Sequence, residues 1–124
     1  MKLKILDNKL KVVKINPNNT NMSDTILNQE FYSITRTDEE LSIVIDEDID
    51  IQSDIVEYNW RAIKIEGILD FSLIGILSKI SAILTQAKIS IFVISTYNTD
   101  YILIKNDKLK NATEVLKQNG YEFV

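Results

Sequence analysis

The chain has 124 residues, of which 14 are Lys or Arg and 18 are Asp or Glu, so its net charge is −4, and it contains neither His nor Cys. The missing Cys excludes disulfides, thiolate nucleophiles and zinc–thiolate sites, and the missing His excludes a Ser-His-Asp triad, an imidazole base and a His-bound metal. This composition favours a binding module over an enzyme, so we predict no catalytic residue, no cofactor and no metal site.

Targeting and partner signals are weak throughout the chain. The N-terminal segment MKLKILDNKLKVV lacks the apolar run of a signal peptide. The most apolar segment, residues 71–84, is interrupted by polar residues and is shorter than a membrane span. An isoelectric point near 4.8, without a basic stripe interleaved with aromatic residues, disfavours nucleic-acid binding. We expect a cytoplasmic protein that binds neither membrane nor nucleic acid.

The first half of the chain predicts few regular elements. Val12–Ile15 is predicted as a strand by its similarity to a later segment. Residues 16–30 hold the only Pro and five Asn, which indicates a loop with one helical turn near Thr25–Asn28. Phe31–Glu47 is predicted as a hairpin with an acidic turn at Asp38–Glu40, and its second strand is Leu41–Asp46.

Half of the carboxylates lie in one segment, residues 37–60, which contains no basic residue. Six oxygen-bearing residues within it have the spacing of an EF-hand calcium loop. That loop requires Gly where this chain has Ile51, and a flanking helix where Leu41–Asp46 reads as a strand. We therefore interpret the segment as a solvated acidic linker between two modules. The six residues are Asp46, Asp48, Asp50, Gln52, Asp54 and Glu57.

The second half predicts a complete βαββαβ unit, the ferredoxin-like arrangement. Its first helix shows apolar residues at spacings of three and four from Phe71, with Asp70 or Ser72 as the N-terminal cap. Its second helix is built on Leu109, Ala112, Val115 and Leu116, with Asn106 or Asp107 as cap and Gly120 in a left-handed C-terminal position. The four strands are predicted at Ala62–Glu66, Ile89–Ser95, Tyr101–Lys105 and Tyr121–Val124.

The two halves are related by an internal similarity. A shift of 60 places residues 31–47 on residues 91–107 without a gap, and a shift of 50 places Val12–Ile15 on Ala62–Ile65. Chance similarity of two β-rich segments is the alternative to a degenerate tandem repeat. We prefer the repeat, with residues 1–60 as a degenerate module plus acidic linker and residues 61–124 as a complete module.

Two polar segments of the second module are candidate ligand contacts. Residues 66–72 pass from a strand to a helix start, whose amides and dipole suit a carboxylate or phosphate, although a tight turn with a helix cap explains them equally well. Residues 95–100 form a hairpin turn that requires only Asn98 and Asp100, which leaves the hydroxyl groups unexplained. The two segments need not be neighbours in one module, so we expect a ligand touching both to lie between two modules.

The runs FYSITRTDEELSIV, WRAIKIEGILDFSLIGIL and ISIFVISTYNTDYILI resemble the small bacterial ACT-domain proteins related to the CASTOR-type arginine sensors. The resemblance implies an α+β fold of tandem ferredoxin-like (βαββαβ) ACT modules, with antiparallel sheets, helices on one face and a degenerate first module. It also implies homodimers and a small effector, usually an amino acid, at an intermodule interface. The family often has Asp at the position of Asn98. The contacts implied by position are Gly67, Ile68, Leu69, Asp70, Ser72, Ser95, Thr96, Tyr97, Asn98, Thr99 and Asp100.

These observations lead to two alternative functions. The first is a non-enzymatic regulatory module that binds an amino acid, with amides of residues 68–72 on its carboxylate and Asp70 or Asp100 on its ammonium group. The second is a structural module that docks a partner enzyme through a sheet edge or the acidic segment, without a small ligand. An isomerase or lyase on the same scaffold lacks a credible base and ranks last.

Overall fold

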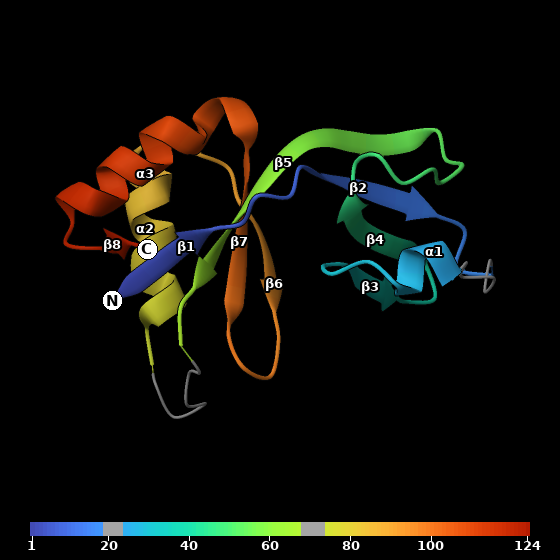
Figure 1. The fold of residues 1–124 in the computed structure, drawn as a ribbon, viewed down its shortest axis with the longest axis horizontal. Helices are drawn as coiled ribbons and strands as arrows, with labels where there is room; N and C mark the ends of the chain where they lie inside the picture. The colour runs from blue at the N-terminus through green and yellow to red at the C-terminus, as the bar shows by residue number, and fades with distance from the viewer. Residues whose placement is uncertain (19–23, 68–73) are drawn as a thin grey trace. The chain divides into compact units, whose positions relative to one another are not determined.

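A computed structural model describes residues 1–18, 24–67 and 74–124, which form two compact units. Unit 1 consists of residues 1–7 and 61–124, and unit 2 consists of residues 8–60 (Figure 1). The fold is α+β, and the long strand β5 (Ile55–Ile65) contributes its first part to unit 2 and its second part to unit 1.

Unit 2 is an antiparallel sheet with the strand order β3-β4-β2-β5. The predicted strand at residues 41–46 and the predicted helical turn near residues 25–28 are both confirmed. The unit also contains β2, β3 and the first part of β5, and both β2 and β3 pair with β4. The bounds are β2 (Leu10–Ile15), α1 (Asp24–Leu27), β3 (Ser33–Arg36) and β4 (Leu41–Asp46).

The core of unit 2 is covered by α1 and by the connection between β4 and β5. Ile26 of α1 packs with strand residues such as Ile43, and Ile49 and Ile51 of the connection add to the same cluster. Lys11 is also buried, and its ammonium group donates to the carbonyl oxygen of Ile49. An irregular segment thus covers the core, because its isoleucines supply the apolar surface that a helix would otherwise provide.

Unit 1 has the strand order β6-β7-β5-β1-β8. All pairs with a described register are antiparallel except that of β1 with β8, which is parallel and joins the two ends of the chain. The final strand therefore pairs with β1, which lies between it and β5. The bounds are β1 (Lys2–Ile5), α2 (Ile76–Gln86), β6 (Phe92–Ser95), β7 (Asp100–Lys105), α3 (Leu109–Gln118) and β8 (Glu122–Phe123).

Helices α2 and α3 cover one face of the unit 1 sheet, as predicted (Figure 1). Ile80 and Leu84 of α2 and Leu116 of α3 are fully buried against alternate residues of the strands. Helix α3 ends at Gln118, and the predicted left-handed Gly120, whose φ is 93°, follows its C-cap Asn119. The amides of Gly120 and Tyr121 donate to Lys117 and Leu116 carbonyls, which closes the last turn.

Both helix starts differ from the prediction. Helix α2 begins at Ile76 and not at Phe71, because Gly75 at its N-cap has a φ of 84°, which is outside the helical region. The predicted caps Asp70 and Ser72 lie outside the described residues. Before α3, residues 106–108 form a 3₁₀ turn, and no side chain caps the α-helix. Asn106 instead accepts a hydrogen bond from Arg61.

The internal repeat is present, but its hairpins correspond at a shift of 59 and not 60. Strand bounds 33–36 and 41–46 become 92–95 and 100–105, and the pair Arg36↔Leu41 becomes Ser95↔Asp100. The buried residues of β4 at 43–45 correspond to those of β7 at 102–104. The shift of 60 aligned similar residue types, whereas the turn length fixes the register.

Two further expectations about the first half need correction. Residues 37–60 do not form a linker, because β4 and the first part of β5 occupy half of that segment and belong to the sheet of unit 2. Residues 1–7, which we expected in the first module, lie in unit 1, because β1 pairs with β5 and β8.

Candidate functional site

One end of the unit 1 sheet brings the strand–helix turn and the hairpin turn together. Strand β5 ends there, α2 begins there, and the β6–β7 turn lies at the same end (Figure 1). The Thr99 side chain is buried, and its hydroxyl donates to the carbonyl oxygen of Ile65 at 2.7 Å. Since Ile65 lies two residues before Gly67, the described start of the strand–helix segment and the hairpin turn are neighbours within unit 1, which the sequence left open.

Gly67 begins the strand–helix turn in a left-handed conformation. Its φ is 91°, and a Cβ atom at this position would meet no atom of the described residues within 4 Å. This left-handed conformation is accessible to Gly at little cost. The predicted contacts Ile68, Leu69, Asp70 and Ser72 lie outside the described residues.

The hairpin turn is held by two threonines. The Thr96 amide donates to the Thr99 carbonyl at 2.9 Å, and the Thr99 amide donates to the Thr96 hydroxyl at 3.2 Å. The Thr96 hydroxyl in turn donates to the Thr99 carbonyl at 2.9 Å. These hydroxyl groups, which the sequence left unexplained, therefore have a structural role, and Asn98 and Asp100 are not what defines the turn.

The other four predicted ligand contacts in this segment take no part in the hydrogen bonds between Thr96 and Thr99. Ser95, Tyr97 and Asn98 are exposed, and Asp100 is half-buried opposite Ser95. Val93 and Ile102, two residues from Ser95 and Asp100 along their strands, pack in the core under the helices. Because side chains alternate along a strand, Ser95 and Asp100 lie on the helix-covered side of the sheet, where α2 begins.

The start of α2 adds two features that the sequence analysis missed. Gly75 precedes the helix in a left-handed conformation, and no side chain caps the first turn. Unpaired N–H groups and the positive end of the helix dipole favour an anion at such a position. Ile74, immediately before it, is 92% exposed. The available sequence signal was Gly75, which interrupts the apolar run of residues 71–84.

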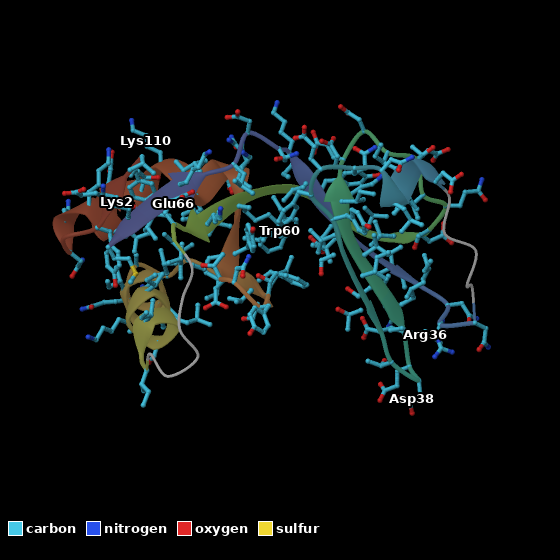
Figure 2. The ribbon with its side chains drawn as sticks, turned by 60° about the horizontal axis from the view of Figure 1, so that its bottom comes forward. Lys2, Arg36, Asp38, Trp60, Glu66 and Lys110 are labelled. Atoms are coloured by element: carbon cyan, nitrogen blue, oxygen red, sulfur yellow. The ribbon has the colours of Figure 1, made fainter. Side chains whose placement is uncertain are left out.

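Lys64 and Glu66 lie close in sequence but on the other face of the sheet. Their charged groups are 3.7 Å apart, and both side chains are about one-third exposed. They alternate with Ile63 and Ile65, which face the helices. Figure 2 shows Glu66 near the end of β5. This ion pair is therefore separate from Ser95 and Asp100.

In residues 1–18, 24–67 and 74–124, no three acidic residues come together in a way that could hold a metal ion. None of the described helices has the length and apolar character needed to cross a bilayer.

Sequence models of two domain families match most of the chain. A sequence model of the ACT domain matches residues 55–118, and a model of an N-terminal domain from a related protein group matches residues 18–54. The human putative protein CASTOR3P is 30% identical over 100 residues, which cover 70% of this chain and 61% of the human protein. The chain thus spans about three-fifths of that relative's length.

Structural comparisons extend the similarity to the whole chain. Protein Atu0741 from Agrobacterium tumefaciens is 31% identical with a TM-score of 0.89, over 99% of this chain and 91% of that one. The ligand-free regulatory subunit of aspartate kinase from Thermus thermophilus has a TM-score of 0.62 at 9% identity, over 92% and 95% of the two chains. The latter similarity concerns the fold alone.

Proposed function

The chain belongs to the ACT-domain family, and we propose that it is a non-enzymatic regulatory protein that binds a free amino acid at the end of the unit 1 sheet where β5 ends and α2 begins. Its fold resembles the regulatory domains of aspartokinases. The proposal concerns the ligand class and the site, and it includes the predicted contacts Ile68, Leu69, Asp70 and Ser72.

The Thr99–Ile65 hydrogen bond is the observation that carries this proposal. It holds the hairpin turn against the end of β5. By strand alternation, Ser95 and Asp100 lie on the helix-covered side of the sheet, where α2 begins. In our proposal, the amides near Gly67 and at the start of α2 bind the ligand carboxylate. Asp100 binds its ammonium group by a charge-assisted hydrogen bond.

We further propose that a second copy of the chain covers this site. Ile74 is 92% exposed and Tyr97 is 80% exposed, and both lie at the end of unit 1 that carries the proposed site. Large apolar side chains exposed together favour a protein contact. A homodimer formed there would bury them and shield the ligand from water.

A thermal-shift screen of the standard amino acids tests the proposal. An amino acid at about 100 times its Kd should stabilise the protein by about 2.7 kcal/mol, whereas no shift with any amino acid at millimolar concentration would refute it. Asp100→Asn should weaken binding of the active amino acid by about tenfold or more, because it removes the charge that faces the ammonium group. Asp107→Asn is the matched control, since Asp107 is exposed and follows β7 at its opposite end.

The alternative function, docking of a partner enzyme without a small ligand, is favoured by one observation. Strand β6 pairs only with β7 in the described sheet, so its other edge is available for strand pairing. Under this alternative, a partner would be captured equally well by the protein and by Asp100→Asn, while Ile94→Pro in β6 would abolish capture. No amino acid would then shift the melting temperature.

A further inference from the structure

The end of helix α3 carries the only Asn of the sequence that is followed by Gly, the pair Asn119–Gly120. Every other Asn precedes a residue with a side chain. Such a side chain hinders attack by the backbone nitrogen of its own residue on the Asn side-chain carbonyl, whereas Gly has no Cβ atom and the widest backbone freedom. Both residues of the pair are exposed to water. Asn119 is therefore the Asn whose side-chain amide is most open to chemical loss.

The folded end of α3 nevertheless holds the two reacting groups apart. Ring closure requires the Gly120 nitrogen to eclipse Asn119 Cβ about the Cα–C bond, but a ψ of 15° brings it almost into eclipse with the Asn119 backbone nitrogen instead. The Gly120 amide donates to the Lys117 carbonyl at 3.0 Å, and the Asn119 side-chain amide donates to the Val115 carbonyl at 2.8 Å. The turn must therefore open, and Asn119 must rotate, before the groups can react.

We propose that Asn119–Gly120 is a site of spontaneous deamidation, and that its reaction is gated by local opening of the turn that ends α3. The Gly120 nitrogen loses its proton to solvent and bonds to Asn119 Cγ, while the side-chain nitrogen leaves as ammonia. Water then opens the five-membered imide ring. Attack at Cγ gives Asp, and attack at the main-chain carbonyl carbon gives isoaspartate, which adds one methylene group to the backbone. Water is the only co-reactant.

The isoaspartate product acts on the pairing of β8 with β1. Shortly after Gly120, the amides of Glu122 and Val124 donate to carbonyl groups of β1 at 3.1 and 2.8 Å. Strand β8 has only two residues, and its register on β1 is set by the short connection from α3. A methylene group inserted at position 119 lengthens that connection and shifts β8 out of register. Deamidation through isoaspartate therefore loosens the strand that joins the two ends of the chain.

Peptide mapping by mass spectrometry tests the gate. The full chain is incubated in mildly alkaline buffer, with and without denaturing urea. We expect Asn119 to be the first Asn converted in urea, and to convert at least about tenfold more slowly in the folded chain. Asn111 is the internal control, because it is exposed on the same helix but precedes Ala112. Equal rates at Asn119 in the two conditions, or earlier conversion of another Asn in urea, would overturn the proposal.

Amide hydrogen exchange tests the consequence for β8. The natural chain is compared with the isolated isoaspartate product and with Asn119→Asp, which carries the same charge on an unaltered backbone. The amides of Glu122 and Val124 should exchange at least about tenfold faster in the isoaspartate form, and less than about threefold faster in Asn119→Asp. Unchanged exchange in the isoaspartate form, or an equal increase in Asn119→Asp, would contradict a shift of β8 caused by the added methylene group.

Discussion

The two hairpins of this protein use the same turn, while the layers that cover their sheets differ. In both turns the amide of the first threonine, Thr37 or Thr96, donates to the carbonyl three residues later at 2.9 Å. The hydroxyl of that threonine accepts from the amide of the same later residue at 3.2 Å. The strands that follow these turns, β4 and β7, have equivalent buried residues at 43–45 and 102–104. Sequence divergence has therefore preserved the register of the hairpin.

The covering layers have diverged completely. Unit 1 uses helices of 11 and 10 residues, whereas unit 2 uses a helix of four residues and an irregular connection that carries Ile49 and Ile51. Different side chains also hold each hairpin in place. The Thr99 hydroxyl of unit 1 donates to the Ile65 carbonyl at the end of β5, and the Arg36 guanidinium of unit 2 donates to the Pro17 carbonyl just after β2. Strand pairing requires a fixed register, while a sheet face requires only that apolar area be covered.

The strongest test of this comparison is the pair Ile43→Ala and Ile102→Ala. Both residues are fully buried at equivalent positions of the two sheets, so each substitution should lower the free energy of unfolding by about 2–5 kcal/mol. Chemical denaturation measures the loss, and amide hydrogen exchange locates it in the unit that carries the substitution. A loss below about 1 kcal/mol for Ile43→Ala alone would show that the two cores are not equivalent.

Gly67→Ala addresses the exit from the first strand of each repeat. Its counterpart in unit 2 is Pro17, whose ring excludes a positive φ. The backbone must therefore take different conformations after β5 and after β2. We expect Gly67→Ala to cost about 1–2 kcal/mol of stability by thermal denaturation. Gly120→Ala, at a φ of 93° and equally free of contacts, should cost the same. Only Gly67→Ala should also weaken amino-acid binding, and equal binding in both variants would argue against the proposed site.

Thr99→Val removes the bond between the unit 1 hairpin and β5. The substitution keeps the side-chain shape but deletes a buried hydroxyl, so we expect a loss of about 1 kcal/mol. Thr37→Val in unit 2, where the hydroxyl is exposed, should cost about 0.5 kcal/mol or less. Urea denaturation distinguishes the two values. If Thr37→Val lowered the free energy of unfolding more than Thr99→Val, the Thr99–Ile65 hydrogen bond would not be what stabilises the unit 1 hairpin.

The smallest effect is expected for Lys11→Met. Lys11 lies buried beneath the connection in unit 2, with its ammonium group on the Ile49 carbonyl and 5.8 Å from the Tyr58 ring. Methionine keeps the aliphatic stem and removes the cost of burying a charge, so stability should stay within about 1 kcal/mol of the natural chain. Hydrogen exchange of residues 47–54 should nevertheless become faster. Unchanged exchange would mean that Ile49 and Ile51 alone hold this connection.

The sequence predicted local elements best where the signal lies within a few residues. Leu41–Asp46 is a strand with the predicted bounds, and the left-handed Gly120 follows the C-cap of α3. The prediction failed for the start of α2, where the apolar periodicity continues upstream of Gly75 but the backbone of Gly75 does not permit a helix. The hairpin correspondence was one residue off, because residue similarity was followed instead of turn length.

The sequence by itself determined the α+β, ferredoxin-like order of the second half, since alternation, helical periodicity and turn residues are local properties. The degenerate first repeat was indicated by internal similarity, and the ACT-type fold by the resemblance of whole runs to a known family. Only the tertiary structure decided which strands share a sheet and which polar groups meet. Residues 1–7 pair with β5 and β8, and Thr99 reaches Ile65, across separations that no local pattern encodes. Such contacts form only after the core has collapsed, because each must offset the entropy of ordering distant segments.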